Sequence, residues 1–88
     1  MSWFVYIVEC IDKTYYTGIT YNLKNRIADH NCGRYKKSFT KGRLPVKLVY
    51  WERFDSRISA AKREIVIKDK SRINKEKLIK SLHRISNL

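Results

Sequence analysis

The sequence predicts a small α+β domain with the element order β-β-α-β-α-α. Two short segments near the start, and a third after Pro45, are rich in the β-branched and aromatic residues that favour strands. Asn22, Ser56 and Asn74 stand where helices would begin, each followed by apolar residues three or four positions apart. With 88 residues the chain is long enough for one hydrophobic core, so we expect a single domain over residues 1–88.

The first two predicted strands form a hairpin. Residues 3–10 carry apolar side chains on both faces, which indicates a central strand that is covered on both sides. Residues 11–14 form a short polar turn, and residues 15–20 return as the second strand. Gly18 inside that strand indicates a bulge or a place where a ligand approaches the backbone. One face of the first strand is expected to carry Phe4, Tyr6 and Val8, and the other Trp3, Val5 and Ile7.

A helix and a third strand are predicted next. Asn22 is placed to cap a helix that runs to about residue 31 and is closed by Gly33. The third strand is expected from Val46 to about residue 54. The residues expected to face the core are Leu23 and Ile27 in the helix, and Val46, Leu48 and Tyr50 on one face of the strand.

Two further helices complete the predicted fold. Ser56 caps a helix to about Lys70, and Asn74 caps a last helix, with Ile73 and Leu78 as a hydrophobic staple. The apolar spacing predicts that these helices bury Ile58, Ala61 and Ile65, and Ile79, Leu82 and Ile85.

The charge of the chain is strongly positive. Its 20 basic and 8 acidic residues give a net charge of +12, and the excess lies in residues 34–88, because the earlier part is balanced. Such a field attracts polyanions, so nucleic acid is the expected partner. The alternatives are a merely soluble basic protein and a ribosome-associated one. The segment 34–44 interleaves aromatics with Lys36, Lys37, Lys41 and Arg43, which we expect to contact a nucleic-acid backbone, unless they form only a solvated loop.

The remaining composition excludes several classes of protein. Cys10 and Cys32 are the only cysteines, and without a CxxC spacing they do not indicate a zinc site. No apolar run approaches the roughly 20 residues of a membrane span. The first strand begins too close to Met1 for a signal peptide. We therefore expect reduced thiols in a cytoplasmic protein that does not enter a membrane.

Five side chains are the candidates for chemistry. Tyr6 and Tyr16 are phenols on the hairpin, and a phenol can act as a base only where positive charge or a metal lowers its pKa. Arg26 can stabilise charge on a phosphate, and His30, one helical turn later, can move a proton or orient a water. Glu64 can hold Mg²⁺ with several waters retained. The simpler alternatives are core tyrosines, a solvated helix face and an i,i+4 pair of Glu64 with Lys68.

These residues and their spacing resemble the GIY-YIG nuclease superfamily, in particular its small standalone bacterial members. The first motif corresponds to Phe4-Val5-Tyr6, and the second to Tyr16-Thr17-Gly18. The segment 22–31 resembles the family helix that carries an arginine and, four residues later, a histidine or tyrosine. Segments 40–50 and 60–68 also match the standalone group, so the resemblance covers nearly the whole chain.

The resemblance implies a three-stranded antiparallel sheet flanked by helices and a Mg²⁺- or Mn²⁺-dependent endonuclease that hydrolyses DNA phosphodiesters with low sequence specificity. It implies that Glu64 is the protein ligand of the metal and that Arg26 holds the scissile phosphate. Tyr16 would activate or position the attacking water, and Tyr6 and His30 would support the proton transfers and the phosphate contacts.

This chain departs from the family pattern in several places. The first motif lacks its glycine and isoleucine, the second has Thr17 in its middle, and Ile19 replaces a lysine found in some members. Asn74 is a candidate for the asparagine that some members place after the glutamate. The alternative functions are a non-catalytic nucleic-acid-binding module with the same fold, and an RNA-directed or ribosome-associated factor.

Overall fold

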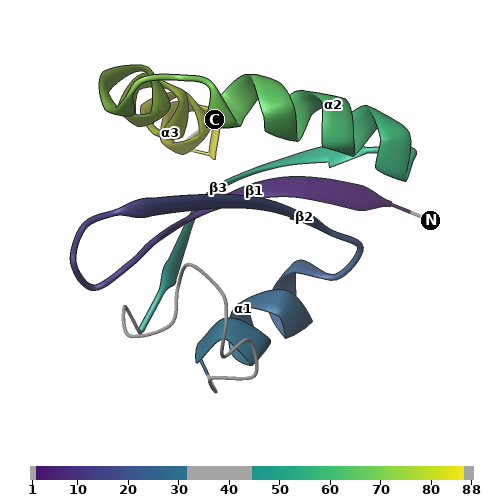
Figure 1. The fold of residues 1–88 in the computed structure, drawn as a ribbon, viewed down its shortest axis with the longest axis horizontal. Helices are drawn as coiled ribbons and strands as arrows, with labels where there is room; N and C mark the ends of the chain where they lie inside the picture. Colours follow the sequence, from purple (N-terminus) through teal and green to yellow (C-terminus); the bar gives the residue numbers. More distant parts are fainter. Residues whose placement is uncertain (1, 32–44, 87–88) are drawn as a thin grey trace.

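A computed structural model describes residues 2–31 and 45–86, and the side chains of His30 and residues 82–86 lie outside this description. The chain forms three strands and three helices in the predicted order (Figure 1). Their bounds are β1 Trp3–Glu9, β2 Tyr15–Thr20, α1 Leu23–Asn31, β3 Lys47–Phe54, α2 Arg57–Lys68 and α3 Arg72–Ser86.

The three strands form one antiparallel sheet in the order β2-β1-β3, which confirms both the predicted fold class and the central position of β1. Ile7 is paired with Thr17 of β2, and Tyr6 is paired with Gly18. Because paired residues share a face of the sheet, β2 presents Tyr16 and Gly18 on the side of Tyr6, and Thr17 on the side of Ile7.

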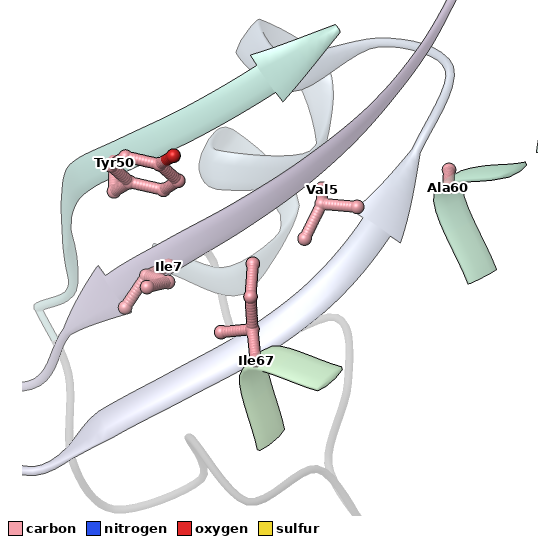
Figure 2. Close-up of a cluster of buried hydrophobic side chains, with 5 residues drawn as sticks. All are labelled: Val5, Ile7, Tyr50, Ala60 and Ile67. Atoms are coloured by element: carbon pink, nitrogen blue, oxygen red, sulfur yellow. The ribbon is translucent and has the colours of Figure 1, made fainter. Parts of the chain in front are cut away.

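The helices cover the two faces of the sheet unequally. α1 lies on one face, and α2 and α3 lie together on the other (Figure 1). The face toward α2 contains a cluster of five buried side chains, drawn in Figure 2: Val5, Ile7, Tyr50, Ala60 and Ile67. On the α1 face, Leu23 and Ile27 pack against a second cluster, which consists of Tyr6, Val8, Cys10 and Val46. The predicted faces of β1 and the predicted core side of α1 are therefore confirmed.

Side-chain caps set the helix ends. The Asn22 side chain accepts a hydrogen bond from the backbone N–H of Asn25 at 3.1 Å, and Ser56 accepts one from Ser59 at 3.1 Å, so both predicted caps are confirmed. The start predicted for α3 is wrong. Ser71 accepts from the Asn74 backbone at 3.2 Å and caps a helix that begins at Arg72. Gly33, predicted to close α1, lies outside the described residues.

The predicted alternation of β3 is also wrong, because the strand contains a bulge. Ile7 is paired with Tyr50 but Val8 is paired with Leu48, which leaves Val49 as an extra residue. Leu48 therefore packs in the α1-face cluster, whereas Tyr50 packs in the α2-face cluster. One strand contributes to both cores as a result.

The expected buried stripe of α2 is wrong as well. Ile58 and Ile65 are exposed, and the buried residues of the helix are Ala60 and Ile67. Ile73, expected to form a hydrophobic staple, is exposed, although Leu78 and Ile79 of α3 do pack against the α2-face cluster.

Candidate functional site

The glycine of the second motif makes room for the tyrosine of the first. A Cβ atom built on Gly18 would lie 2.7 Å from the Tyr6 hydroxyl oxygen and 2.9 Å from its Cζ, closer than real Cβ contacts come. The Tyr6 side chain is only 1% exposed, so other side chains would have to give way if its ring moved. The pairing of β1 with β2 is regular through Gly18. There is thus no bulge at this glycine, and the group that approaches its backbone is the phenol of Tyr6.

The second phenol lies next to the first. The ring centroids of Tyr6 and Tyr16 are 6.3 Å apart, with an interplanar angle of 49°. Tyr16 is half-buried and packs against the α1-face cluster with Leu23 and Ile27 of α1. The structure therefore brings the two predicted tyrosines together on one face of the hairpin.

Helix α1 carries the predicted arginine and histidine. Arg26 is half-buried in the first turns of the helix, and its backbone N–H donates to the Asn22 carbonyl at 3.0 Å. His30 follows one helical turn later. The far end of α1 is held to the residue before β3, because the Asn31 side chain accepts from the Val46 backbone N–H at 2.7 Å and donates to its carbonyl at 3.2 Å.

Glu64 lies on α2, in the layer on the other face of the sheet. It is four residues after Ala60 and three before Ile67, so it shares the side of the helix that faces the sheet. Its side chain is only 20% exposed and pairs with Lys68 at 3.4 Å, the i,i+4 pair considered above. The predicted position at the edge of a buried stripe is correct, although the stripe consists of other residues.

A second acidic residue near α2 was missed by the sequence reasoning. Glu52 of β3 accepts hydrogen bonds from Arg63 at 2.9 and 3.0 Å, and the hydroxyl of Tyr50 also donates to it. Burial raises the pKa of Glu52, but the hydrogen bonds from Arg63 and Tyr50 outweigh burial and hold it below its ordinary value. The same burial, together with the contact to Glu52, raises the pKa of Tyr50. The sequence did hold a signal for this site, because Glu52 lies between Tyr50 and Phe54 on one side of the predicted strand.

The Glu52–Arg63 pair also orients α2. Arg63 reaches toward β3, and successive residues of a helix are 100° apart, so Glu64 lies on the opposite flank of the sheet-facing stripe. Since the sheet order is β2-β1-β3, that flank is the one nearer β2. On β2, Thr17 faces α2 and is 3% exposed, and its hydroxyl has no hydrogen-bond partner among the described residues.

The predicted residues thus form two groups on either side of the edge strand β2. Tyr6, Tyr16 and the helix of Arg26 and His30 lie on one face, and Glu64 belongs to the layer on the other. Asn74 is exposed in the first turn of α3.

The predicted nucleic-acid contacts of the 34–44 segment, Lys36, Lys37, Lys41 and Arg43, lie outside the described residues. Exposed basic side chains are nevertheless frequent on α2 and α3, among them Lys62, Lys68, Lys77 and Lys80.

The side chains that could bind a metal suit an ion that takes few ligands from the protein. Within residues 2–31 and 45–86, no three His, Cys, Asp or Glu side chains gather into a metal-binding group. Of the two acids near the sheet side of α2, Glu52 is held by two hydrogen bonds from Arg63, whereas Glu64 has a longer ion pair with Lys68 at 3.4 Å. One carboxylate fits Mg²⁺, which keeps several waters and takes further oxygens from a substrate phosphate, and does not fit a closed protein site.

No helix in the described part of the chain has the length and apolar character that a membrane crossing requires.

Comparison with known proteins identifies the family. The GIY-YIG catalytic domain family matches residues 2–78. A UPF0213 protein of Syntrophus aciditrophicus is 52% identical over 77 residues, which cover 88% of each chain. A UPF0213 protein of Natronomonas pharaonis is 49% identical over 86% of this chain and 88% of its own. The solution NMR structure of a UPF0213 protein from Bacillus halodurans has a TM-score of 0.58 and 39% identity, covering 91% of this chain and 84% of that one. The chain belongs to the GIY-YIG catalytic domain family.

Proposed function

We propose that the protein is a divalent-metal-dependent endonuclease that hydrolyses DNA phosphodiester bonds with low sequence specificity. The observation that carries the proposal is the packing of the two motif tyrosines, 6.3 Å apart, around a glycine that leaves room for one of them. The net charge of +12 supports a polyanionic substrate. Contacts to phosphates carry no sequence information, and such contacts are what exposed lysines provide.

Four residues on the α1 side of the sheet take part in hydrolysis in this proposal. Tyr16 positions the attacking water, and Tyr6 supports it from the neighbouring strand. Arg26 contacts the scissile phosphate, where its charge stabilises the negative charge of the transition state. His30, one turn along the same helix, assists proton transfer.

Glu64 is the residue that would hold Mg²⁺ or Mn²⁺. When bound, such an ion polarises the phosphate and stabilises the leaving oxygen. Its ion pair with Lys68 is the competing contact. The Lys68 side chain is 54% exposed, so it can turn to solvent and leave the carboxylate to a cation. Glu64 lies on one side of the sheet, and the side chains of Tyr6 and Tyr16 project from the other. Because β2 is the edge strand between them, we place the phosphate along this edge.

Glu64→Gln is the decisive variant, with Glu76→Gln as a matched control. Glu76 also pairs with a basic residue of its own helix, Arg72, at 3.2 Å. Purified protein with Mg²⁺ or Mn²⁺ is incubated with labelled single-stranded, duplex and branched DNA, and with RNA of the same sequence. We expect Glu64→Gln to abolish cleavage while the Kd for DNA, measured by fluorescence anisotropy, stays within about threefold of the unmodified protein.

The other outcomes are equally informative. DNA that is bound but not cut by the unmodified protein under any of these conditions would identify a non-catalytic binding module. Equal loss of cleavage in Glu64→Gln and Glu76→Gln would remove the special role of Glu64. Cleavage or binding of RNA alone would point to the RNA-directed alternative.

A further inference from the structure

An exposed tryptophan lies on the same face of the sheet as the two tyrosines. Trp51 of β3 is paired with Tyr6 of β1, so their side chains project from the same face. Trp51 is 41% exposed, and β3 lies at an edge of the sheet. Leu23 and Ile27 of α1 pack against the neighbouring cluster, which leaves part of the indole uncovered.

The indole of Trp51 is held in a defined orientation. Its ring meets that of Phe4 in a T-shaped contact, with centroids 5.9 Å apart and an interplanar angle of 74°. Phe4 lies two residues before Tyr6 in β1, so both side chains project from the same face. The uncovered aromatic surface is therefore a fixed part of the sheet.

A positive charge stands beside this aromatic pair. Arg53 is paired with Phe4 across the sheet and lies two residues after Trp51 on the same face. Its side chain is 58% exposed, donates to the Ser2 hydroxyl at 2.7 Å and approaches Asp55 at 3.5 Å. An exposed pair of this kind is weak, so the guanidinium remains available to a phosphate.

We propose that Trp51, backed by Phe4 and flanked by Arg53, is a stacking platform for an unpaired base of the DNA strand. An aromatic face beside a cation suits a nucleotide, whose base stacks on the ring while its phosphate meets the charge. The bases of an intact duplex are stacked on one another and do not reach such a ring. The inference rests on the proposed function, since it makes single-stranded or branched DNA the preferred substrate.

The first test measures affinity without cleavage. Binding of a labelled thymidine homopolymer and of a duplex of equal length is measured by anisotropy in the presence of a chelator. Trp51→Ala should raise the Kd for the single strand by about 5- to 150-fold and that for the duplex by less than twofold. Trp51→Phe keeps an aromatic face and should stay within about threefold of the unmodified protein.

Tyr21→Ala is the matched control. Tyr21 is 61% exposed, and its ring contacts that of Trp3, which packs against the α2-face cluster. Removing this aromatic should leave both affinities unchanged. Circular dichroism melting curves show whether each variant is folded.

A second measurement does not depend on removing the platform. The chain has two tryptophans, so in a Trp3→Phe variant the fluorescence reports on Trp51 alone. The single strand should quench this emission in a saturable titration, and the duplex should quench it much less.

Three results would overturn the proposal: equal changes for single strand and duplex in Trp51→Ala, no change for either, or no quenching of Trp51 by the single strand. All arms omit divalent cations, so their outcome is separate from that of the cleavage assay. A protein that cuts nothing but passes these tests would keep the platform and lose the proposed hydrolysis.

Discussion

Gly18→Ala is the substitution whose cost the structure defines most directly. The added methyl group would meet the Tyr6 hydroxyl oxygen at 2.7 Å, its Cζ at 2.9 Å and its Cε1 at 3.1 Å. These atoms belong to a rigid ring in the buried α1-face cluster, so either the ring or the β2 backbone must move. Overpacking of this kind costs about 1–3 kcal/mol. Since 1 kcal/mol lowers the Tm of a domain of this size by about 4–8 °C, the loss is easily measured.

A double-mutant cycle separates the clash from other effects of the glycine. Tyr6→Leu removes all three contacting atoms, so Gly18→Ala should cost little in that background. We expect a coupling free energy of about 1–3 kcal/mol between the two positions, from thermal and urea unfolding followed by circular dichroism. If Gly18→Ala destabilises the protein equally with and without the Tyr6 ring, the glycine is needed for another reason, and the steric explanation is refuted.

Three further predictions concern residues that support the site. Asn31→Ala removes both hydrogen bonds to Val46 and leaves its buried backbone groups unpaired, so denaturant unfolding should show a loss of about 1–3 kcal/mol; an unchanged midpoint would contradict the anchoring role. Thr17→Val replaces a buried hydroxyl that has no partner among the described residues with a methyl group, and calorimetry should show a Tm equal to or above that of the unmodified protein. Because the pKa of Glu52 is lowered from 4.5 in the folded state, its contribution is present above pH 4.5 and is lost as the pH falls through the lower, folded value. The free energy of unfolding should therefore decrease less between pH 5 and pH 3, as measured by urea unfolding, in Glu52→Gln than in the unmodified protein, and identical slopes would contradict the pairing with Arg63.

The hairpin of β1 and β2 and the helix α1 were predictable because their signals are local, whereas the bulge of β3 leaves no such signal. The uninterrupted apolar run of β1 indicates a strand that is covered on both faces, and the short polar turn fixes its pairing with β2, which places Tyr6 and Tyr16 on one face. Asn22 marks the start of α1 through a hydrogen bond within its own first turn. Such features depend only on neighbours along the chain.

The orientation of α2 was not predictable, because it depends on a partner in another element. The helix carries enough apolar residues for more than one stripe, and the exposed Ile58 and Ile65 form the more regular one. The arrangement that is formed instead buries Ile67 and lets Arg63 reach Glu52 on β3, eleven residues earlier. For the same reason, the layer in which Glu64 lies relative to the tyrosines is a property of the assembled fold.

The bulge at Val49 has a consequence for how this protein can diverge. The offset of one position is what allows Leu48 and Tyr50 to enter opposite cores. If the same residues paired without the bulge, Leu48 and Tyr50 would project from one face of the sheet, and one of the two would leave its cluster. Deletion of Val49 would instead make Leu48 and Tyr50 neighbours in a regular strand and keep them on opposite faces, so this stretch can lose its bulge only together with its extra residue.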